Sequence, residues 1–319
     1  MKIVILDGNA LNPGDLSWDP IREFGEVTVY PRTESLEDTI QRIGDSEIVL
    51  INKVPITEEV FAACPNIKLI CVQATGYNVV DCEAAKRRRI PVCNVPSYST
   101  AAVAQFTMAL LLEVCHRIGH HDRLVHEGKW CESESFCFWD SPQMELDGKT
   151  MGIIGFGSIG QAVGRLSKAL GMEVITYSRS VRSEGKEIAE YVDLDTLLAR
   201  SDVISLHCPL FPETEKMINE QTIGKMKDGV ILLNTSRGGV IDEMAVAEGL
   251  RSGKIRSAAV DVVSEEPMRR ENPLLTTPNC IITPHMAWAP IETRKRLLGV
   301  VAENIRGFLN SSPRNVVNP

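Results

Sequence analysis

The sequence predicts an α/β protein built from two doubly wound parallel sheets, each in its own domain. The chain has 319 residues, more than one ordinary hydrophobic core accommodates, so we expect two domains. Short runs rich in β-branched residues alternate with polar, helix-like stretches, and this alternation occurs both before and after an apolar segment near residue 100. Such alternation is typical of parallel sheets covered by helices.

Five apolar runs in the first hundred residues predict the strands of the first domain. Polar stretches at 33–44 and 81–89 predict helices between some of these strands. The runs are KIVIL (2–6), EVTVY (26–30), EIVLI (47–51), IKLICV (67–72) and PVCNV (91–95).

The segment 99–125 predicts one long helix that crosses from the first domain to the second. Its apolar residues lie on nearly every side, as in a helix that is buried over most of its surface. The following segment, 127–146, is irregular and aromatic, with Trp130, Phe136 and Trp139 among its side chains. An exposed arm this apolar usually packs against something, so we expect a partner subunit to cover it.

Six further runs predict the strands of the second domain, with helices at 158–170, 194–199 and 243–250. A last helix at 291–309 is expected to return to the first domain. That domain would therefore comprise 1–99 and 286–319, and the second would comprise 100–285. The runs are TMGIIG (150–155), EVITY (173–177), DVISLH (202–207), VILLNT (230–235), SAAVDV (257–262) and CIITP (280–284).

Composition and charge narrow the classes of partner. The net charge of −8 argues against nucleic acid, whose phosphates need a basic surface. The most apolar segment, 101–112, is shorter than the roughly 20 residues that span a bilayer, and the N-terminus reads as a strand rather than a signal peptide. Nine scattered cysteines without a CxxC pair are typical of reduced thiols. We therefore expect a cytoplasmic protein with no membrane partner.

Four histidines near the end of the long helix raise the question of a metal site. His116 and His120 have the i, i+4 spacing that suits zinc, but no third ligand follows at a compelling distance. We interpret these two residues, with His121 and His126, as solvent-facing, and expect no metal.

A glycine-rich turn begins the second series of strands. Gly155, Gly157 and Gly160 form G-x-G-x-x-G between a predicted strand and a helix that opens at Ser158, and another strand follows at βαβ spacing. Such glycines permit a tight turn and close approach of the backbone to a pyrophosphate, while the helix N-terminus supplies N–H donors. The second domain is therefore predicted to bind a dinucleotide.

The end of the second strand in this domain bears on which dinucleotide binds. A carboxylate there would take both ribose hydroxyls of NAD and repel the 2′-phosphate of NADP, but the chain has Ser178, Arg179 and Ser180. Two hydroxyls and a guanidinium can hold a phosphate, so we predict that NADP binds at least as well as NAD. In the alternative, Arg179 stacks on adenine and NAD binds through Ser178.

Several strands of the second domain end in polar residues that suit the reduction of a keto acid. The carboxyl ends of parallel strands open on one crevice, so His207, the Thr235-Ser236-Arg237 segment, Asp261 and His285 should converge there. Arg237 could hold a carboxylate and His285 could give a proton to a carbonyl oxygen. Glu266 could orient His285 and stabilise its imidazolium form.

These motifs together resemble the D-isomer-specific 2-hydroxyacid dehydrogenase family, most closely its glycerate dehydrogenase (hydroxypyruvate/glyoxylate reductase) branch. The resemblance covers nearly the whole chain and rests on several linked motifs in the family's order. They are GIIGFGSIGQAVG (152–164), HCPLFPETEKMI (207–218), LLNTSRGGVIDEMAV (232–246), AAVDVVSEEP (258–267) and TPHMAW (283–288).

The resemblance implies a flavodoxin-like substrate-binding domain, a Rossmann NAD(P)-binding domain, and a catalytic triad of Arg237, Glu266 and His285. It implies that backbone N–H groups of the loop Ala74-Thr75-Gly76 hold the substrate carboxylate, and that two chains form a homodimer through the NAD(P)-binding domain. The residues expected to contact the dinucleotide are Thr100, Gly155, Gly157, Ser158, Ile159, Gly160, Ser178, Arg179, Ser180, His207, Cys208, Pro209, Thr214, Thr235, Ser236, Asp261 and His285.

The same resemblance suggests hydroxypyruvate or glyoxylate as the substrate. Trp139 and Trp288 are expected to wall a pocket too small for a bulky side chain, and the chain length leaves no room for an additional regulatory domain. Two alternatives stay open: a dehydrogenase for a different 2-keto acid, and a dinucleotide-sensing module that binds another protein.

Overall fold

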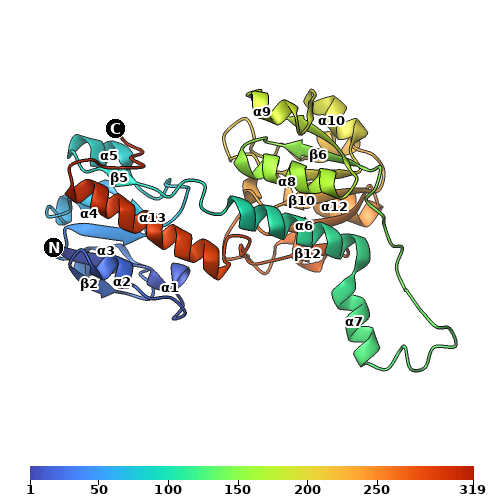
Figure 1. Cartoon of the computed structure of the whole chain (residues 1–319), viewed down its shortest axis with the longest axis horizontal. Helices are drawn as coiled ribbons and strands as arrows, with labels where there is room; N and C mark the ends of the chain where they lie inside the picture. Colours follow the sequence, from blue (N-terminus) through green and yellow to red (C-terminus); the bar gives the residue numbers. More distant parts are fainter. The chain divides into compact units, whose positions relative to one another are not determined.

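The computed structural model describes all residues, 1–319, and divides into two compact units (Figure 1). Unit 1 comprises Met1–Ser99 and Trp288–Pro319, and unit 2 comprises Thr100–Ala287. The chain leaves unit 1 at the residue expected from the sequence, and it returns after Ala287 rather than after His285.

Unit 1 contains a five-stranded sheet in which every strand pair is parallel. Its order, β2-β1-β3-β4-β5, is that of flavodoxin-like domains. Three of the strands are buried over nearly their whole length because helices cover both faces of the sheet, which explains their uninterrupted apolar sequences. The strands are β1 (Lys2–Ile5), β2 (Glu26–Val29), β3 (Ile48–Ile51), β4 (Leu69–Val72) and β5 (Val92–Cys93).

Two helices of unit 1 begin where a side chain satisfies a free N–H group of the first turn. Ser35 accepts a hydrogen bond from the backbone of Asp38, and Asp81 accepts one from Ala84. The returning helix α13 buries Leu297, among others, against one face of the sheet. The helices are α1 (Gly8–Leu11), α2 (Asp19–Arg22), α3 (Leu36–Ile43), α4 (Glu58–Ala63), α5 (Cys82–Arg87) and α13 (Ile291–Leu309).

Unit 2 contains a seven-stranded parallel sheet with the order β12-β11-β10-β9-β6-β7-β8. This is the Rossmann order, with β6, the strand that precedes the glycine turn, between β9 and β7. The two doubly wound sheets confirm the predicted fold class. The short strand β8 has no counterpart among the six predicted runs. The strands are β6 (Thr150–Ile154), β7 (Glu173–Tyr177), β8 (Glu190–Tyr191), β9 (Val203–Leu206), β10 (Val230–Asn234), β11 (Ile255–Val260) and β12 (Cys280–Ile282).

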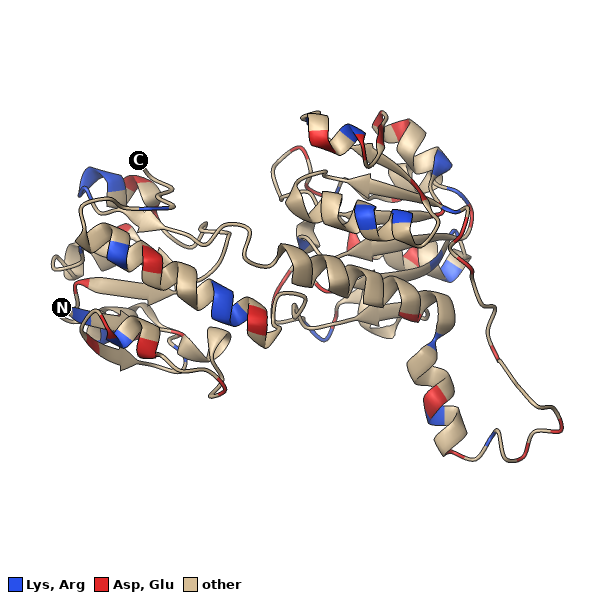
Figure 2. Ribbon diagram, in the orientation of Figure 1, with Lys and Arg blue, Asp and Glu red and all other residues tan.

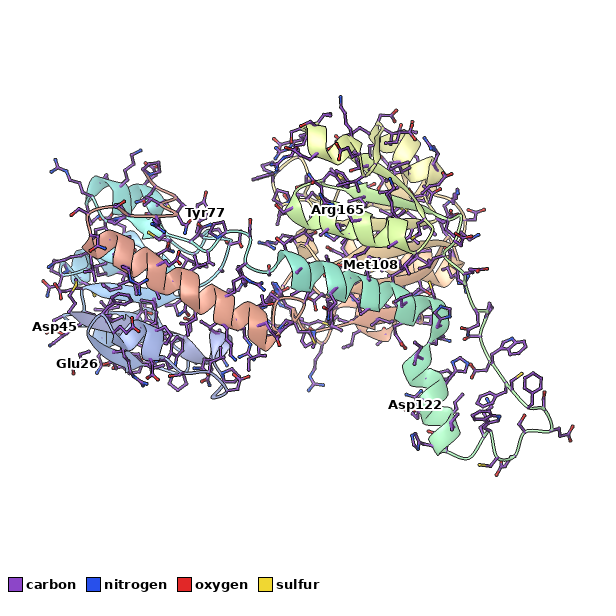
Figure 3. The ribbon with its side chains drawn as sticks, in the orientation of Figure 1. Glu26, Asp45, Tyr77, Met108, Asp122 and Arg165 are labelled. Carbon is purple, nitrogen blue, oxygen red and sulfur yellow. The ribbon has the colours of Figure 1, made fainter.

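Helices cover both faces of the unit 2 sheet. On one face, α6 and α8 pack together through apolar side chains that include Met108 and Val163 (Figure 3 labels Met108). On the other face, α12 contributes Val246 and Leu250 to a second core. The helices are α6 (Thr100–His116), α7 (Ile118–His126), α8 (Ser158–Ala169), α9 (Ser183–Lys186), α10 (Leu194–Arg200), α11 (Glu220–Gly224) and α12 (Glu243–Ser252).

The expectation of a single long helix over 99–125 is wrong, because the chain bends by 56° between α6 and α7. Arg117 adopts a left-handed conformation at the break, with a φ of 49°. Burial explains the change: α6 carries one acidic residue, Glu113, and buries much of its surface, whereas α7 buries no residue (Figure 2 shows α6 almost uniformly tan). No single helix has the length and apolar composition to cross a membrane, although α6 and α7 together pass that test.

The segment 127–146 forms an arm that leaves the body of unit 2 after α7 and returns to β6 (Figures 1 and 3). Its large side chains are exposed, most of all Phe136 at 89%. Asp140 ties the arm back to α7, since its carboxylate lies 2.7 Å from His120 Nε2 and 3.4 Å from His121 Nε2. The expectation of solvent-facing histidines is therefore wrong for His120 and His121, which are half-buried against the arm, whereas His116 and His126 are exposed.

Candidate active site

The glycine turn follows β6, and its geometry admits no side chain at two of its positions. Gly155 has a φ of +92°, and a Cβ there would lie 2.6 Å from the backbone nitrogen of Cys208. A Cβ on Gly160 would lie 2.2 Å from the carbonyl oxygen of Gly155. Glycine is therefore required at both positions, as in turns that bring a helix N-terminus close to a strand end.

The second glycine of the motif, Gly157, leaves an open cradle at the start of α8. Gly157 is the N-cap residue, no side chain caps the helix, and no atom lies within 4 Å of where its Cβ would be. The backbone N–H groups of Ser158, Ile159 and Gly160 therefore point from the helix end without a capping acceptor. An uncapped helix N-terminus beside open space fits a pyrophosphate.

The end of β7 carries the polar segment that bears on the choice of dinucleotide. Ser178 is half-buried, and Arg179 and Ser180 are exposed. The guanidinium carbon of Arg179 lies 4.7 Å from the ring centroid of Phe211, which belongs to the loop after β9. Sequence reasoning did not foresee Phe211. The only signal was an aromatic residue inside the HCPLFPETEKMI motif.

The loop after β9 contains three of the expected dinucleotide contacts beside His207. Burial lowers the pKa of His207 to about 4, so its imidazole is neutral at pH 7, and Nε2 lies 2.8 Å from the Ser205 hydroxyl. Thr214 closes the loop, because its hydroxyl donates to the carbonyl of Pro209 at 2.7 Å and accepts from the backbone of Phe211 at 2.8 Å. Thr214 is thus a structural element of this loop.

Asp261 holds the segment that carries His285. Its buried carboxylate accepts hydrogen bonds from the hydroxyl of Thr283 at 2.6 Å and from the backbone N–H groups of Met286 and Ala287, both at 2.9 Å. His285 itself has a φ of 52°, and its N–H donates to the Asp261 carbonyl at 2.8 Å. These bonds stabilise a backbone conformation that is unfavourable for a residue with a side chain.

The structure brings His285 and Glu266 into direct contact. The Nδ1 atom of His285 lies 2.7 Å from Oε2 of Glu266, and each side chain is about one third exposed, at 32% and 31%. Because the carboxylate occupies Nδ1, the other ring nitrogen, Nε2, is left for chemistry. A histidine oriented by a carboxylate in this way can act as a general acid or base.

Arg237 lies in a loop that packs directly on the loop of Glu266. A Cβ on the next residue, Gly238, would lie 1.9 Å from the backbone carbonyl carbon of Val263, so the two backbones touch. Val263 in turn precedes Glu266 by three residues. The guanidinium of Arg237 is exposed, and its one hydrogen bond goes to the carbonyl of Ser236 at 2.7 Å.

Side chains around Arg237 hold these loops in place. Asn234, at the end of β10, donates to the carbonyl of Arg237 at 3.0 Å and accepts from the hydroxyl of Ser236 at 2.9 Å. Glu243, the first residue of α12, accepts from both the backbone and the hydroxyl of Ser264, at 2.7 and 2.8 Å. Sequence reasoning did not identify Glu243, because nothing local in the sequence indicates its distant partner.

The expected carboxylate-binding loop lies in unit 1, after β4. The hydroxyl of Thr75 donates to the carbonyl of Val95 at 2.8 Å, and the side chain of Asn94 donates to the carbonyl of Thr75 at 2.7 Å. These contacts use side-chain and carbonyl groups of the loop, and its backbone N–H groups from Ala74 to Gly76 have no partner within the chain. They are free to bind an anion.

The two tryptophans expected to wall the pocket lie in different units. Trp139 lies on the arm with 66% of its surface exposed, and Trp288 is half-buried against the core of unit 1. Within one chain the structure gives Trp139 no pocket to line, so its role stays a prediction. Thr235 also has a partner inside the protein, since its hydroxyl lies 2.9 Å from that of Thr107 on α6.

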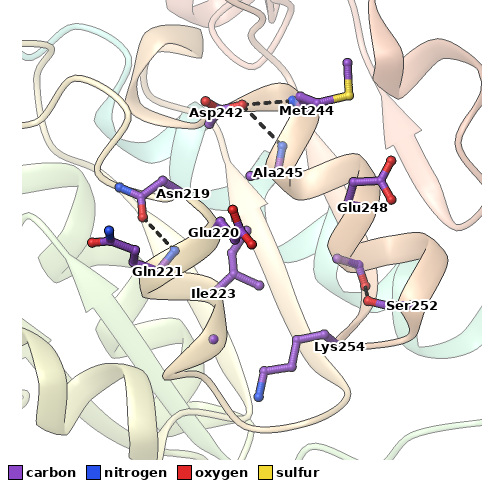
Figure 4. Close-up of a pocket in the computed structure, with 12 residues that line it drawn as sticks. Asn219, Glu220, Gln221, Ile223, Asp242, Met244, Ala245, Glu248, Ser252 and Lys254 are labelled. Atoms are coloured by element: carbon purple, nitrogen blue, oxygen red, sulfur yellow. Dashed lines mark hydrogen bonds between the residues drawn. The ribbon is translucent and has the colours of Figure 1, made fainter.

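One surface hollow of unit 2 is separate from the candidate active site. It encloses about 920 Å³ between α11 and α12 and contains none of the expected site residues (Figure 4). The residues that line it are Asn219, Glu220, Gln221, Ile223, Gly224, Asp242, Met244, Ala245, Glu248, Gly249, Ser252 and Lys254. No group of three or more histidine, cysteine or acidic residues could hold a metal ion.

A dinucleotide turn on a doubly wound sheet, together with a histidine–carboxylate pair in the same unit, defines an NAD(P)-dependent oxidoreductase. Residues 108–287 match the family model for the NAD binding domain of D-isomer specific 2-hydroxyacid dehydrogenases. The chain belongs to the D-isomer specific 2-hydroxyacid dehydrogenase family. The resemblance stated from the motifs, and the prediction of an oxidoreductase, are thereby confirmed.

Individual relatives match over almost their whole length. The chain is 56% identical over 321 residues to a hydroxypyruvate reductase of Blautia hydrogenotrophica, with 100% of both chains covered. It is 38% identical to a glycerate dehydrogenase of Methylorubrum extorquens, covering 99% of this chain and 98% of that one. Among solved structures, an acyclic imino acid reductase in complex with NADPH and D-Arg superposes with a TM-score of 0.85 at 33% identity, covering 99% of this chain and 100% of that one.

Proposed function

We propose that this protein reduces hydroxypyruvate to D-glycerate, or glyoxylate to glycolate. The observation that carries the proposal is the 2.7 Å contact of His285 with Glu266 in a chain 56% identical to a hydroxypyruvate reductase. When bound, the nicotinamide supplies a hydride to the carbonyl carbon of the keto acid. The residues of the protein must then hold the substrate and deliver one proton.

His285 delivers that proton. In its imidazolium form, Nδ1–H donates to the carboxylate of Glu266, and Nε2–H donates to the carbonyl oxygen of the substrate. As the carbonyl carbon gains a hydride, the oxygen takes the proton from Nε2, and the neutral imidazole remains bonded to Glu266. The negative charge of Glu266 stabilises the protonated state from which the reaction starts.

Arg237 holds the carboxylate of the keto acid. Its exposed guanidinium has four N–H groups that make no hydrogen bond within the chain, enough for a bidentate contact. The unpartnered backbone N–H groups of Ala74, Thr75 and Gly76 are proposed to bind a substrate carboxylate as well. Both interactions select 2-keto acids over simple ketones.

NADP is proposed as the preferred dinucleotide. No carboxylate follows β7 to repel a 2′-phosphate, and Arg179 makes no ion pair. The structural neighbour described above that contains NADPH shows that this fold accommodates the phosphorylated form in a relative. NAD binding through Ser178 is the alternative outcome.

A homodimer and a cytoplasmic location complete the proposal. Phe136, Trp130 and Trp139 expose large apolar surfaces on the arm, which a second copy of the chain would cover. Light scattering coupled to size-exclusion chromatography tests this directly. A monomer at micromolar concentration would contradict the dimer, and a Phe136→Asp variant should shift a dimer toward monomer.

The activity itself is tested with a panel of 2-keto acids, assayed with NADH and NADPH in parallel. Hydroxypyruvate and glyoxylate should turn over fastest, hydroxypyruvate should yield the D isomer of glycerate, and a His285→Asn variant should lose roughly 100-fold or more in kcat. Much faster turnover of 2-ketoisocaproate or phenylpyruvate would contradict the substrate assignment. Negligible turnover of every acid would favour a dinucleotide-sensing module.

A further inference from the structure

Arg179 and Phe211 belong to loops on opposite sides of the glycine turn, and their side chains are in contact. Arg179 comes two residues after β7, and Phe211 lies in the loop after β9. In the sheet, β7 and β9 flank β6, the strand that ends at Gly155. Their side chains meet with the guanidinium carbon 4.7 Å from the ring centroid. The pair therefore bridges the carboxyl edge of the sheet beside the turn that fits a pyrophosphate.

Four arginines stack on an aromatic ring, and only Arg179 has no oxygen acceptor for its guanidinium. Arg42, over Tyr30, donates to the hydroxyl of Thr33, and Arg88, over Phe61, pairs with Glu58. Arg306 over Phe24 lies 3.6 Å from Glu23. The guanidinium of Arg179 makes neither a hydrogen bond nor an ion pair. Its face is occupied by a ring while all five donors at its edge remain available.

The platform beneath Arg179 is itself held firmly. The backbone N–H of Phe211 donates to the hydroxyl of Thr214 at 2.8 Å, and its carbonyl accepts from the backbone N–H of Thr214 at 3.0 Å. These bonds close the loop into a tight turn, with the ring of Phe211 40% exposed. The ring can therefore orient a long, flexible side chain that would otherwise sample many rotamers.

We propose that Phe211 is a specificity-determining residue that positions the guanidinium of Arg179 for the 2′-phosphate of an adenosine nucleotide. A stacked guanidinium keeps its planar edge free for a bidentate contact with a phosphate monoester, whereas a carboxylate partner would occupy that edge and repel the ligand. The inference rests on the NADP preference proposed above and adds the residue that creates it.

The test uses binding alone, with the full-length protein and no keto acid. Isothermal titration calorimetry compares adenosine 2′,5′-bisphosphate with 5′-AMP, which lacks the 2′-phosphate. The wild type should prefer the bisphosphate. Phe211→Leu should lower the affinity for the bisphosphate by about two- to fivefold, because an exposed cation–π contact contributes modestly. The affinity for 5′-AMP should stay unchanged. Phe211→Tyr, which keeps the ring, should retain the preference.

Two controls separate positioning from simple packing. Phe24→Leu removes an arginine–aromatic contact in unit 1 and should change neither affinity. In an Arg179→Ser background, Phe211→Leu should have no further effect on the bisphosphate, because the two residues act as one unit. Three outcomes would overturn the proposal. Phe211→Leu could lower the affinity for both ligands equally, it could lower the affinity for the bisphosphate even without Arg179, or the wild type could bind both ligands equally well.

The readout also keeps this inference distinct from the proposed activity. If no keto acid is reduced but the bisphosphate preference depends on Phe211, the reaction fails and the positioning role stands. If keto acids are reduced and the wild type shows no preference for the bisphosphate, the NADP preference and the positioning role fail while the activity stands. If the preference persists unchanged in Phe211→Leu, the positioning role fails alone. Circular dichroism and thermal unfolding of each variant confirm that the comparison concerns folded protein.

Discussion

His285 Nδ1 lies 2.7 Å from Glu266 Oε2, although the two residues are 19 positions apart in the chain. Both positions depend on the backbone: the left-handed conformation of His285 is held by Asp261, and the loop of Glu266 is held by Glu243 through Ser264. The imidazole is thereby directed with one nitrogen toward a carboxylate and the other away from it. This fixes which ring atom can exchange a proton with a ligand.

Glu266→Gln should lower kcat/KM for hydroxypyruvate reduction by roughly 10- to 100-fold at neutral pH. The amide keeps a hydrogen-bond acceptor but removes the charge that stabilises the imidazolium. Reduction starts from that protonated form, so the loss should fall on kcat more than on KM for the keto acid. The measurement is steady-state kinetics at pH 7 with NADPH.

The neighbouring Glu265 provides the matched control for this variant. Glu265 is exposed and pairs with Arg269, so Glu265→Gln should leave both kcat and KM unchanged. A kcat of Glu266→Gln equal to that of the wild type would show that Glu266 does not act through His285.

Arg237→Lys should raise KM for the keto acid by about 10- to 100-fold, with a smaller change in kcat. Lysine keeps the charge but loses the fork that makes two parallel bonds to a carboxylate, and a charged hydrogen bond contributes about 1.5–3 kcal/mol. Steady-state kinetics measures the change. Arg251→Lys, at an exposed arginine paired with Glu248, is the control that should have no effect. An unchanged KM in Arg237→Lys would exclude Arg237 from carboxylate binding.

The edge of the sheet at which the candidate site lies could be predicted from the sequence. In a parallel sheet, residues that directly follow a strand all lie at the carboxyl edge. His207, Asp261 and His285 each follow an apolar run, and every such run in unit 2 ends at the same edge. The contact of His285 with Glu266 was anticipated from the chemistry of proton transfer rather than from a distance.

Other features depend on tertiary contacts that no local pattern encodes. The apolar composition of 99–125 continues past Arg117, and only the loss of burial after α6 explains why the helix breaks there. Phe211 meets Arg179, and Glu243 meets Ser264, because loops from separate βα units lie next to each other. In each pair the partner is more than 20 residues away, beyond the range of helix or strand periodicity.

Gly238→Ala should reduce activity strongly and destabilise unit 2. The added Cβ would lie 1.9 Å from the carbonyl carbon of Val263, so the loops of Arg237 and Glu266 must separate. Overpacking of this kind costs about 1–3 kcal/mol, and more when backbone must move. Gly299→Ala is the control, because its site in the middle of α13 has open space and alanine favours a helix.

Chemical unfolding and kcat/KM of both glycine variants provide the measurement. Gly299→Ala should retain activity and gain about 0.5–1 kcal/mol of stability. Wild-type activity in Gly238→Ala would show that the contact between the two loops is not needed to position their side chains.

His207 should make the protein less stable as the pH falls from about 6.5 toward 4. Burial lowers the pKa of His207 to about 4 in the folded state, whereas an unfolded histidine has a pKa near 6.5. Between these values the unfolded chain binds a proton that the folded chain does not, so acidification favours unfolding. The contribution to the free energy of unfolding changes by at most about 1.4 kcal/mol per pH unit and is fully present only above about 6.5.

Because other groups also titrate in this range, the measurement is a difference between variants. His207→Gln keeps a side-chain nitrogen that can reach the Ser205 hydroxyl but cannot be protonated, so its free energy of unfolding should fall less steeply between pH 6.5 and 4 than that of the wild type. His126→Gln, at an exposed histidine on α7, should follow the wild-type slope. Urea unfolding at pH 7, 6 and 5 without dinucleotide gives the three slopes. If the free energies of unfolding of His207→Gln and the wild type fell in parallel with pH, His207 would be protonated as easily in the folded chain as in the unfolded one. Burial would then not keep its imidazole neutral.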